Sequence, residues 1–147
     1  PGRFEAVRHI EKPALAAEFL PLVGTEELQS AVLEGGFKGT EALNIVNRQM
    51  ARTATTEQTF RWLQENGDTL VAMIPETFRA RILPVFGKSF CTRQKADEWQ
   101  AFVESHAAAA PGYERALAQA TESVLLCATL RENTQAELLD AFAAITD

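Results

Sequence analysis

The chain has 147 residues, of which 46% are hydrophobic and 23% are charged, and its formal net charge is −6. These values fit a single globular domain over residues 1–147 that can bury its own core, and they exclude a disordered chain. The 14 basic and 20 acidic residues are spread over both halves, and no apolar run is long enough to cross a bilayer. The sequence therefore predicts no nucleic-acid partner and no membrane span.

The first third of the chain reads as a series of short helices. It begins on Pro1-Gly2 without a Met, which suggests a piece of a longer protein. Proline and glycine separate three helix patterns, around residues 3–11, 13–23 and 26–34. Thr40 is a candidate cap for the next helix, in which apolar side chains recur at helical spacing at Leu43, Val46 and Met50.

The stretch TEQTFRWLQENGDTLVAMIP contains the most distinctive break. Thr55 and Gln58 have the spacing of a capping box at the start of one helix, and Gly67 is a natural stop at its end. Asp68 can then cap a second helix. Two helices joined by a glycine turn over residues 56–74 fit a hairpin in a helical stack, plain packing or a DNA-reading helix-turn-helix. The second helix is almost wholly apolar and leaves few groups to read bases, which disfavours the last of these.

Helix signals continue to the end of the chain. Pro84 is expected to end or kink the helix that follows Pro75. Two amphipathic segments, 92–106 and 113–131, then face each other as a hairpin. A last helix is predicted to open at a capping box formed by Thr134 and Glu137. Its apolar positions, expected to be buried, are Leu138, Phe142 and Ile145.

These patterns give roughly eight helices with short connections and no sustained strand alternation. Short connections imply antiparallel neighbours. We therefore predict an all-α fold of stacked antiparallel helix pairs, that is, an α-solenoid of the HEAT or armadillo kind. A compact helical bundle is the alternative, because helical periodicity is the same in both.

Catalytic and metal-binding motifs are absent from the sequence. The histidines and cysteines are His9, Cys91, His106 and Cys127, and they lack the short paired spacing of a zinc site. His106 continues an apolar stripe and is predicted to be a partly buried packing residue, whereas His9 is predicted to lie on the surface. No HExxH, GxSxG or glycine-rich phosphate loop is found. We expect no catalytic residue, metal site or cofactor in this chain.

The two cysteines are spaced for a possible disulfide. In the predicted hairpin, Cys91 and Cys127 each lie 18 residues from a turn near Ala109, about 27 Å along a helix. They should therefore reach the same height. A Cys91–Cys127 bond is expected if the parent protein is exported to an oxidising compartment, and two buried free thiols are the alternative.

Four arginines form another group of interest. Arg48 and Arg52 are one helical turn apart, and Arg79 and Arg81 lie on the helix after Pro75. Exposed arginines are commonly solvated or paired with nearby carboxylates, and such pairs contribute little to stability. That is the default interpretation of these four residues.

Three segments resemble a known family: FRWLQENGDTLVAMIP, SFCTRQKADEWQAFVESH and GYERALAQATESVLLCATL. The chain is similar, over about residues 40–147, to the helical C-terminal domain of zinc metallo-aminopeptidases of the aminopeptidase N and puromycin-sensitive type, particularly bacterial members. Gly67 departs from this pattern, because many relatives carry an aromatic there. The matching residues are Trp62, Leu63, Asn66, Asp68, Phe90, Cys91, Trp99, Phe102, Gly112, Arg115, Leu117, Gln119 and Glu122.

The resemblance implies a non-catalytic domain that closes as a bowl over the catalytic domain of the same parent chain. The bowl would enclose the substrate chamber and limit peptide access, and zinc would belong to the catalytic domain. Asn66-Gly67 would then be the turn between stacked helices, and Trp62 a packing residue. The family's zinc-binding HExxH and its substrate-amine motif have no counterpart here, so this chain alone is not expected to be an enzyme.

The same resemblance gives the arginines a hypothetical role. A peptide held by its N-terminus at the zinc would present its carboxylate to the inner wall of the bowl. At least one of the four residues Arg48, Arg52, Arg79 and Arg81 would line that wall and bind it. The competing hypothesis is a free-standing helical-repeat module that binds a partner protein. The compartment, bacterial cytoplasm or periplasm, stays open at this point.

Overall fold

The computed structural model describes residues 25–34 and 39–146, and within them the secondary structure is helical with no strand. The all-α prediction is therefore confirmed. The helices predicted around 3–11 and 13–23, and His9, lie outside the described residues. The elements are α3 Thr25–Leu33, α4 Gly39–Met50, α5 Thr56–Met73, α6 Glu76–Ile82, the 3-10 helices η2 Leu83–Ser89 and η3 Ala107–Ala109, α7 Arg93–Ser105, and α8 Glu114–Thr146.

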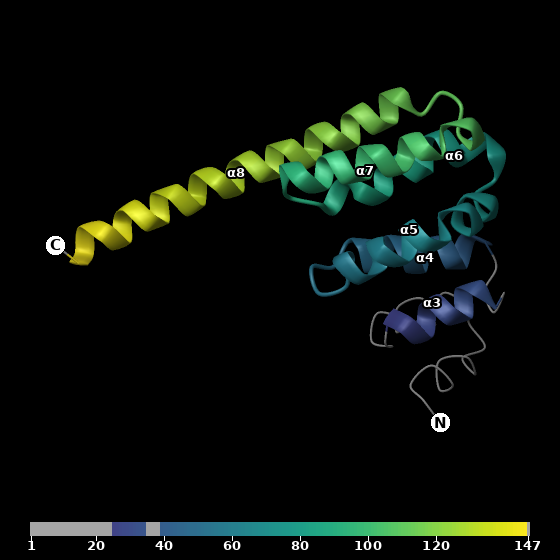
Figure 1. Ribbon diagram of the computed structural model, residues 1–147, viewed down its shortest axis with the longest axis horizontal. Helices are drawn as coiled ribbons and strands as arrows, with labels where there is room; N and C mark the ends of the chain where they lie inside the picture. The colour runs from purple at the N-terminus through teal and green to yellow at the C-terminus, as the bar shows by residue number, and fades with distance from the viewer. Residues whose placement is uncertain (1–24, 35–38, 147) are drawn as a thin grey trace.

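The helices are layered in chain order (Figure 1). Elements α3, α4 and α5 lie in the part nearer the N-terminus, and α6, α7 and α8 lie above them. Sequence neighbours pack on each other, since α4 contacts α5 and α7 contacts α8, while η2 joins the two parts by packing on α4, α7 and α8. Neighbouring helices thus pair as the short connections predict. A solenoid of the HEAT or armadillo kind stays a prediction.

An aromatic cluster fills the space between α5, η2 and α7. Phe60 and Phe90 meet edge to face with ring centroids 5.1 Å apart, and Trp99 stacks on Phe102 at 5.1 Å. The Trp99 indole donates its Nε1–H to the carbonyl oxygen of Pro84 at 2.9 Å, so its polar atom is satisfied. These rings are all buried, and such pairs stabilise a core beyond their buried area.

The break predicted at Asn66-Gly67 is a kink at Asn66, where two helical segments meet within α5. Helix α5 runs from Thr56 to Met73, and Asn66 alone has a non-helical backbone, with φ −125° and ψ 20°. The predicted break is therefore confirmed as a kink between two helical segments, but Gly67 is not the left-handed helix stop that was predicted, because its φ is not positive. Gly67 is needed for close packing instead, because an added Cβ would lie 2.7 Å from His106 Nε2 and 3.0 Å from Phe102 Cε2. A glycine in a sequence pattern looks the same whether it ends a helix or allows close packing.

The predicted capping box at the start of α5 is also wrong. Thr55 holds the N-cap position, but its hydroxyl donates to the carbonyl oxygen of Gln49 at 2.7 Å and makes no capping bond. The amide of Gln58 instead reaches Glu26 on α3, at 3.5 Å. Tertiary contacts with α3 and the end of α4 therefore take the side chains that the local pattern assigned to the cap.

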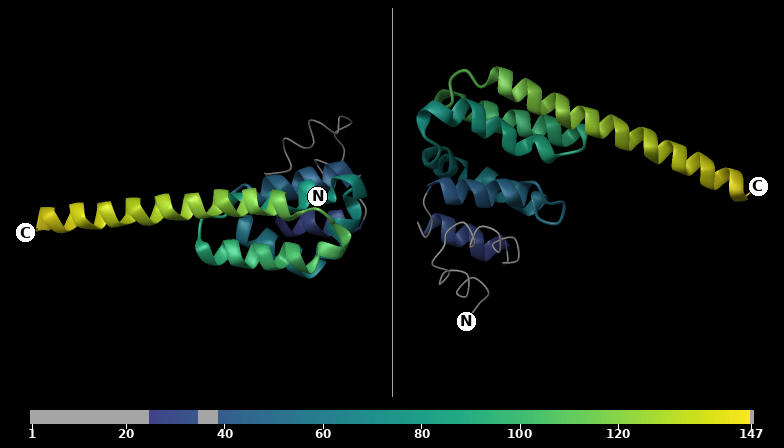
Figure 2. Two further views of the ribbon diagram at one scale, coloured as in Figure 1. Left: turned by 90° about the horizontal axis from the view of Figure 1, so that it is seen from above. Right: turned by 180° about the vertical axis from the view of Figure 1, so that it is seen from behind.

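Helix α8 is continuous to Thr146, so the separate last helix was a wrong prediction. Thr134 lies inside α8, and its hydroxyl donates back to the carbonyl oxygen of Leu130 at 2.9 Å, as mid-helix threonines commonly do. The burial expected for Leu138 and Phe142 is not seen, since they are 54% and 64% exposed. The C-terminal half of α8 extends beyond the rest of the chain in every view (Figure 2).

His106 packs as the sequence predicts. Its ring lies 4.7 Å from that of Phe102, its Nδ1 is 2.8 Å from the Phe102 carbonyl oxygen, and its side chain is 14% exposed. The Nε2 atom is 3.5 Å from a carboxylate oxygen of Asp68. Trp62, predicted to be a packing residue, is 7% exposed. Both residues therefore belong to the core between α5 and α7.

Candidate functional site

The four predicted arginines lie on two elements and do not form one cluster. Arg48 is exposed in the last turn of α4, and Arg52 is exposed just after it. Arg79 and Arg81 are in the last turn of α6. Arg79 is half-buried and its Nε donates to the carbonyl oxygen of Ile74 at 2.9 Å, which ties this guanidinium to the backbone before α6.

Arg81 differs from the other three because it lines a groove. The groove has a volume of about 570 Å³ and runs between α4, α6, η2 and α8. We call it the α4–α8 groove. Its lining residues are Thr40, Leu43, Asn44, Asn47, Phe78, Arg81, Ile82, Val85, Phe86, Ala116 and Gln119.

The chemistry of the α4–α8 groove is mixed. Asn44, Asn47 and Gln119 present amides that can both donate and accept hydrogen bonds. Phe78 is 49% exposed and Val85 is 36% exposed, so apolar surface is available beside them. With Arg81 these groups could contact a polar backbone, an apolar side chain and a carboxylate. No carboxylate lines this groove.

Sequence reasoning missed the amides of this groove. Thr40, Asn44 and Asn47 recur at spacings of four and three residues along the exposed side of α4. That polar stripe is visible in the sequence, but a polar stripe is also the ordinary solvent face of a helix. Only the approach of α6 and α8 turns it into the wall of a groove.

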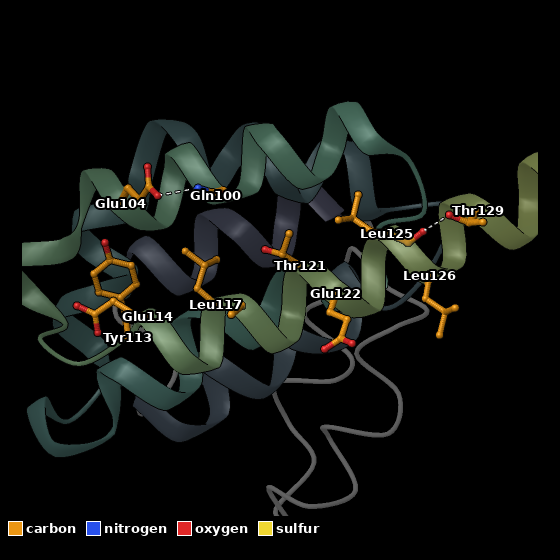
Figure 3. Close-up of a pocket in the computed structure, with 11 residues that line it drawn as sticks. Gln100, Glu104, Tyr113, Glu114, Leu117, Thr121, Glu122, Leu125, Leu126 and Thr129 are labelled. Carbon is orange, nitrogen blue, oxygen red and sulfur yellow. Dashed lines mark hydrogen bonds between the residues drawn. The ribbon is translucent and has the colours of Figure 1, made fainter.

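A second groove, between α7 and α8, has the opposite charge (Figure 3). Its volume is about 710 Å³, and Leu117 and Leu125 form part of its apolar lining. Glu104, Glu114 and Glu122 supply three carboxylates, and neither Lys nor Arg is among its lining residues. Of these two grooves, the α4–α8 groove therefore suits a carboxylate ligand better.

The strongest charge network lies apart from both grooves. Lys95 Nζ is 2.9 Å from Glu57 on α5 and 2.7 Å from Glu98 on α7, and it lies 5.1 Å from the ring centroid of Phe60. Burial opposes the charge on Lys95, but its hydrogen bonds to Glu98 and Glu57 outweigh burial and raise the pKa of Lys95. The same hydrogen bond from Lys95 lowers the pKa of Glu98. This network joins α5 to α7 and has no apparent link to a ligand.

Cys91 and Cys127 are brought together as a disulfide. Their Cα atoms are 5.0 Å apart, and the bond joins the segment before α7 to the middle of α8. Thr92 caps α7 beside it by accepting a hydrogen bond from the Lys95 amide at 3.2 Å. Cys91 therefore lies just before α7 and not within it. A bond of this kind persists in an oxidising compartment.

Neither a metal site nor a membrane helix is found in the described part of the chain. No group of three or more His, Cys, Asp or Glu side chains could hold a metal ion there. Over the same residues, none of the helices combines the length and apolarity needed to span a bilayer.

A comparison with protein families identifies the chain. The model of the ERAP1-like C-terminal domain matches residues 8–126, which is most of the sequence. The chain belongs to this family. No curated protein and no solved structure gives a significant match. As an ERAP1-like C-terminal domain, the chain is a non-catalytic domain of an aminopeptidase, and a catalytic domain belongs to the same parent chain. The predicted family is thereby confirmed.

Proposed function

We propose that this ERAP1-like C-terminal domain encloses the substrate chamber of a zinc aminopeptidase and holds the distal end of the peptide in the α4–α8 groove. Family membership supports the first part of the proposal. The position of Arg81 among amides and exposed apolar side chains supports the second. The zinc and the hydrolytic reaction belong to the catalytic domain of the parent.

Arg81 is the residue of the four whose surroundings best suit a peptide carboxylate. A guanidinium can donate two parallel hydrogen bonds to a carboxylate, and no acidic side chain in the groove competes for it. Asn44 and Gln119 can hydrogen-bond the peptide backbone, and Phe78 can contact the last side chain. Together these groups would recognise a C-terminal residue with an apolar side chain.

The other three arginines have weaker claims. Arg79 is already bonded to the Ile74 carbonyl oxygen, so less of its guanidinium is available to a ligand. Arg48 and Arg52 lie at the far end of α4 and do not line the groove. In this proposal they would contact only peptides that extend past the α4–α8 groove.

The proposal is tested with the Arg81→Ala variant of the intact parent enzyme. A charge-assisted hydrogen bond contributes about 1.5–3 kcal/mol, and the exposure of Arg81 places it near the lower figure. We therefore expect KM for long peptides to rise about tenfold while KM for single-residue reporters is unchanged. Arg61→Ala, an exposed arginine of α5 outside the groove, is the matched control.

A second comparison, between peptides with a free C-terminal carboxylate and peptides with a C-terminal amide, tests whether Arg81 binds that carboxylate. Peptides that carry a C-terminal amide should bind the unaltered enzyme and the Arg81→Ala variant equally, because the charged acceptor is gone. Equal rises in KM for peptides and reporters, or equal effects on acid and amide peptides, would contradict the role of Arg81. Chamber enclosure would be contradicted if removing the domain left the length preference for peptides unchanged.

A further inference from the structure

The Cys91–Cys127 bridge lies where α8 leaves the body of the domain. Cys127 precedes Ala128, which is 1% exposed and is the last buried residue in the described part of α8. Beyond it, residues 130–144 are all exposed. On the other side of the bridge, Cys91 lies just before α7, and the two Cα atoms are 5.0 Å apart. The bridge is therefore a covalent anchor at the foot of the outer half of α8.

The two cysteines of the bridge differ in exposure. Cys127 is exposed on α8, whereas Cys91 is partly buried. Both line a groove with a volume of about 700 Å³ that follows this part of α8. A thiolate has to reach the sulfur that it attacks before thiol–disulfide exchange can occur. Access from this groove therefore favours attack at Cys127.

The charge of the same groove favours an anionic thiol. Arg131 lies four residues after Cys127, one turn further along the same side of α8, and it is the one charged side chain among the described residues that line the groove. It forms no ion pair with another described residue. A thiol that also carries carboxylates can accept a charge-assisted hydrogen bond from this guanidinium, and a thiol without carboxylates cannot.

The position of Cys91 favours its sulfur as the leaving group. Cys91 precedes Thr92, which caps α7 by accepting a hydrogen bond from the Lys95 amide at 3.2 Å. The N-terminal end of this 13-residue helix carries a partial positive charge, which stabilises a nearby thiolate. Cys127 lies in the interior of α8, away from both of its ends. Exchange is faster when the leaving sulfur forms the more stable thiolate, so this effect also favours attack at Cys127.

We propose that Cys127 is a site of reversible S-thiolation by a small anionic thiol of the glutathione class. The thiolate sulfur forms a bond to Cys127 Sγ as the bond between the two cysteines breaks, and the electron pair of the broken bond leaves with Cys91 as a thiolate. A second thiolate can then attack the small thiol's sulfur in this mixed disulfide, which releases Cys127 as a thiolate and gives the disulfide of the small thiol. Modification of Cys127 thus opens the covalent anchor of α8.

Brief exposure of the oxidised 147-residue chain to about 5 mM reduced glutathione under native conditions tests the proposal. The reaction is stopped with acid, free thiols are alkylated at mildly acidic pH, and a non-reduced tryptic digest is analysed by mass spectrometry. Cys91 and Cys127 fall in different tryptic peptides, SFCTR and ALAQATESVLLCATLR. We expect at least about fivefold more glutathione on the Cys127 peptide than on the Cys91 peptide, with the alkyl group on Cys91.

A neutral thiol and two arginine variants test the preference for an anionic thiol. Arg131→Gln should lower the rate of exchange with glutathione about threefold relative to the rate with 2-mercaptoethanol, which carries no carboxylate. Arg115→Gln is the matched control, because Arg115 is also exposed on α8 but does not line the groove. This control should leave the ratio of the two rates unchanged.

Three results would overturn the site at Cys127. These are glutathione found mainly on Cys91, a bridge that exchanges only after the chain is unfolded in urea, and a chain that keeps two free thiols after air oxidation. An unchanged ratio of rates in Arg131→Gln would overturn the preference for an anionic thiol.

Discussion

Gly87→Ala is expected to disrupt the aromatic core. A Cβ at Gly87 would fall on the indole ring of Trp99, against Cδ1, Cδ2 and Cε2, well inside van der Waals contact. Trp99 is 1% exposed and its Nε1–H is bonded to the Pro84 carbonyl oxygen, so the ring has no free space into which to move. The added methyl group therefore has to displace the ring and lengthen or break that hydrogen bond.

The expected loss of stability follows from these contacts. Overpacking a tight core costs about 1–3 kcal/mol, and leaving a buried N–H unpaired costs about 1–3 kcal/mol more. The lower unfolded-state entropy of alanine offsets about 0.4–1 kcal/mol. We expect the free energy of unfolding to fall by about 2–5 kcal/mol. With a urea m-value of about 2 kcal/mol/M, the unfolding midpoint would fall by about 1–2.5 M.

Urea unfolding followed by circular dichroism measures this change. In a double-mutant cycle, the smaller ring of Trp99→Phe should make the Gly87→Ala substitution at least 1 kcal/mol less damaging. Gly112→Ala is the control, since its Cβ meets no atom within 4 Å and only its φ of +84° makes it costly. That variant should lose about 1 kcal/mol and show no coupling to Trp99. A loss below about 0.5 kcal/mol for Gly87→Ala would refute the packing described for the core.

Two further predictions concern the links to α7. The Cys91–Cys127 bond closes a loop with a sequence separation of 36 residues. The chain-entropy model predicts that such a bond stabilises the folded state by about 4 kcal/mol. Reducing the oxidised chain, or replacing both cysteines by alanine, should therefore lower the free energy of unfolding by about 2–4 kcal/mol. Free thiols in the non-reduced tryptic digest of protein from an oxidising compartment would contradict that bond. The hydrogen bond from Lys95 lowers the pKa of Glu98 below its ordinary value of 4.5. The stability that ionised Glu98 contributes is therefore present above pH 4.5 and is lost as the pH falls through the lowered pKa. Glu98→Gln should be less stable than the unaltered chain at pH 7 and equally stable near pH 2, and a difference independent of pH would contradict this account.

The sequence by itself determined the helix class and most of the core. Apolar side chains at helical spacing in α4, α7 and the first half of α8 have to be buried on one side, and Leu43, Val46, Trp99, Val103 and Val124 are buried accordingly. It also indicated that Cys91 and Cys127 could meet, because equal distances from one turn place two residues at equal heights. These inferences use only the period of the helix and the length of its links, which are local properties of the chain.

Only the tertiary structure decided where helices end and which surfaces are left open. The pattern at Thr55, Gly67 and Thr134 fits caps and stops. In the structure Thr55 bonds the end of α4, Gly67 packs against His106, and Thr134 lies inside the continuous α8. The α4–α8 groove likewise requires segments about 70 residues apart to converge. A single helix face looks the same in sequence whether it meets solvent or a partner, since burial depends on neighbours that local periodicity does not specify.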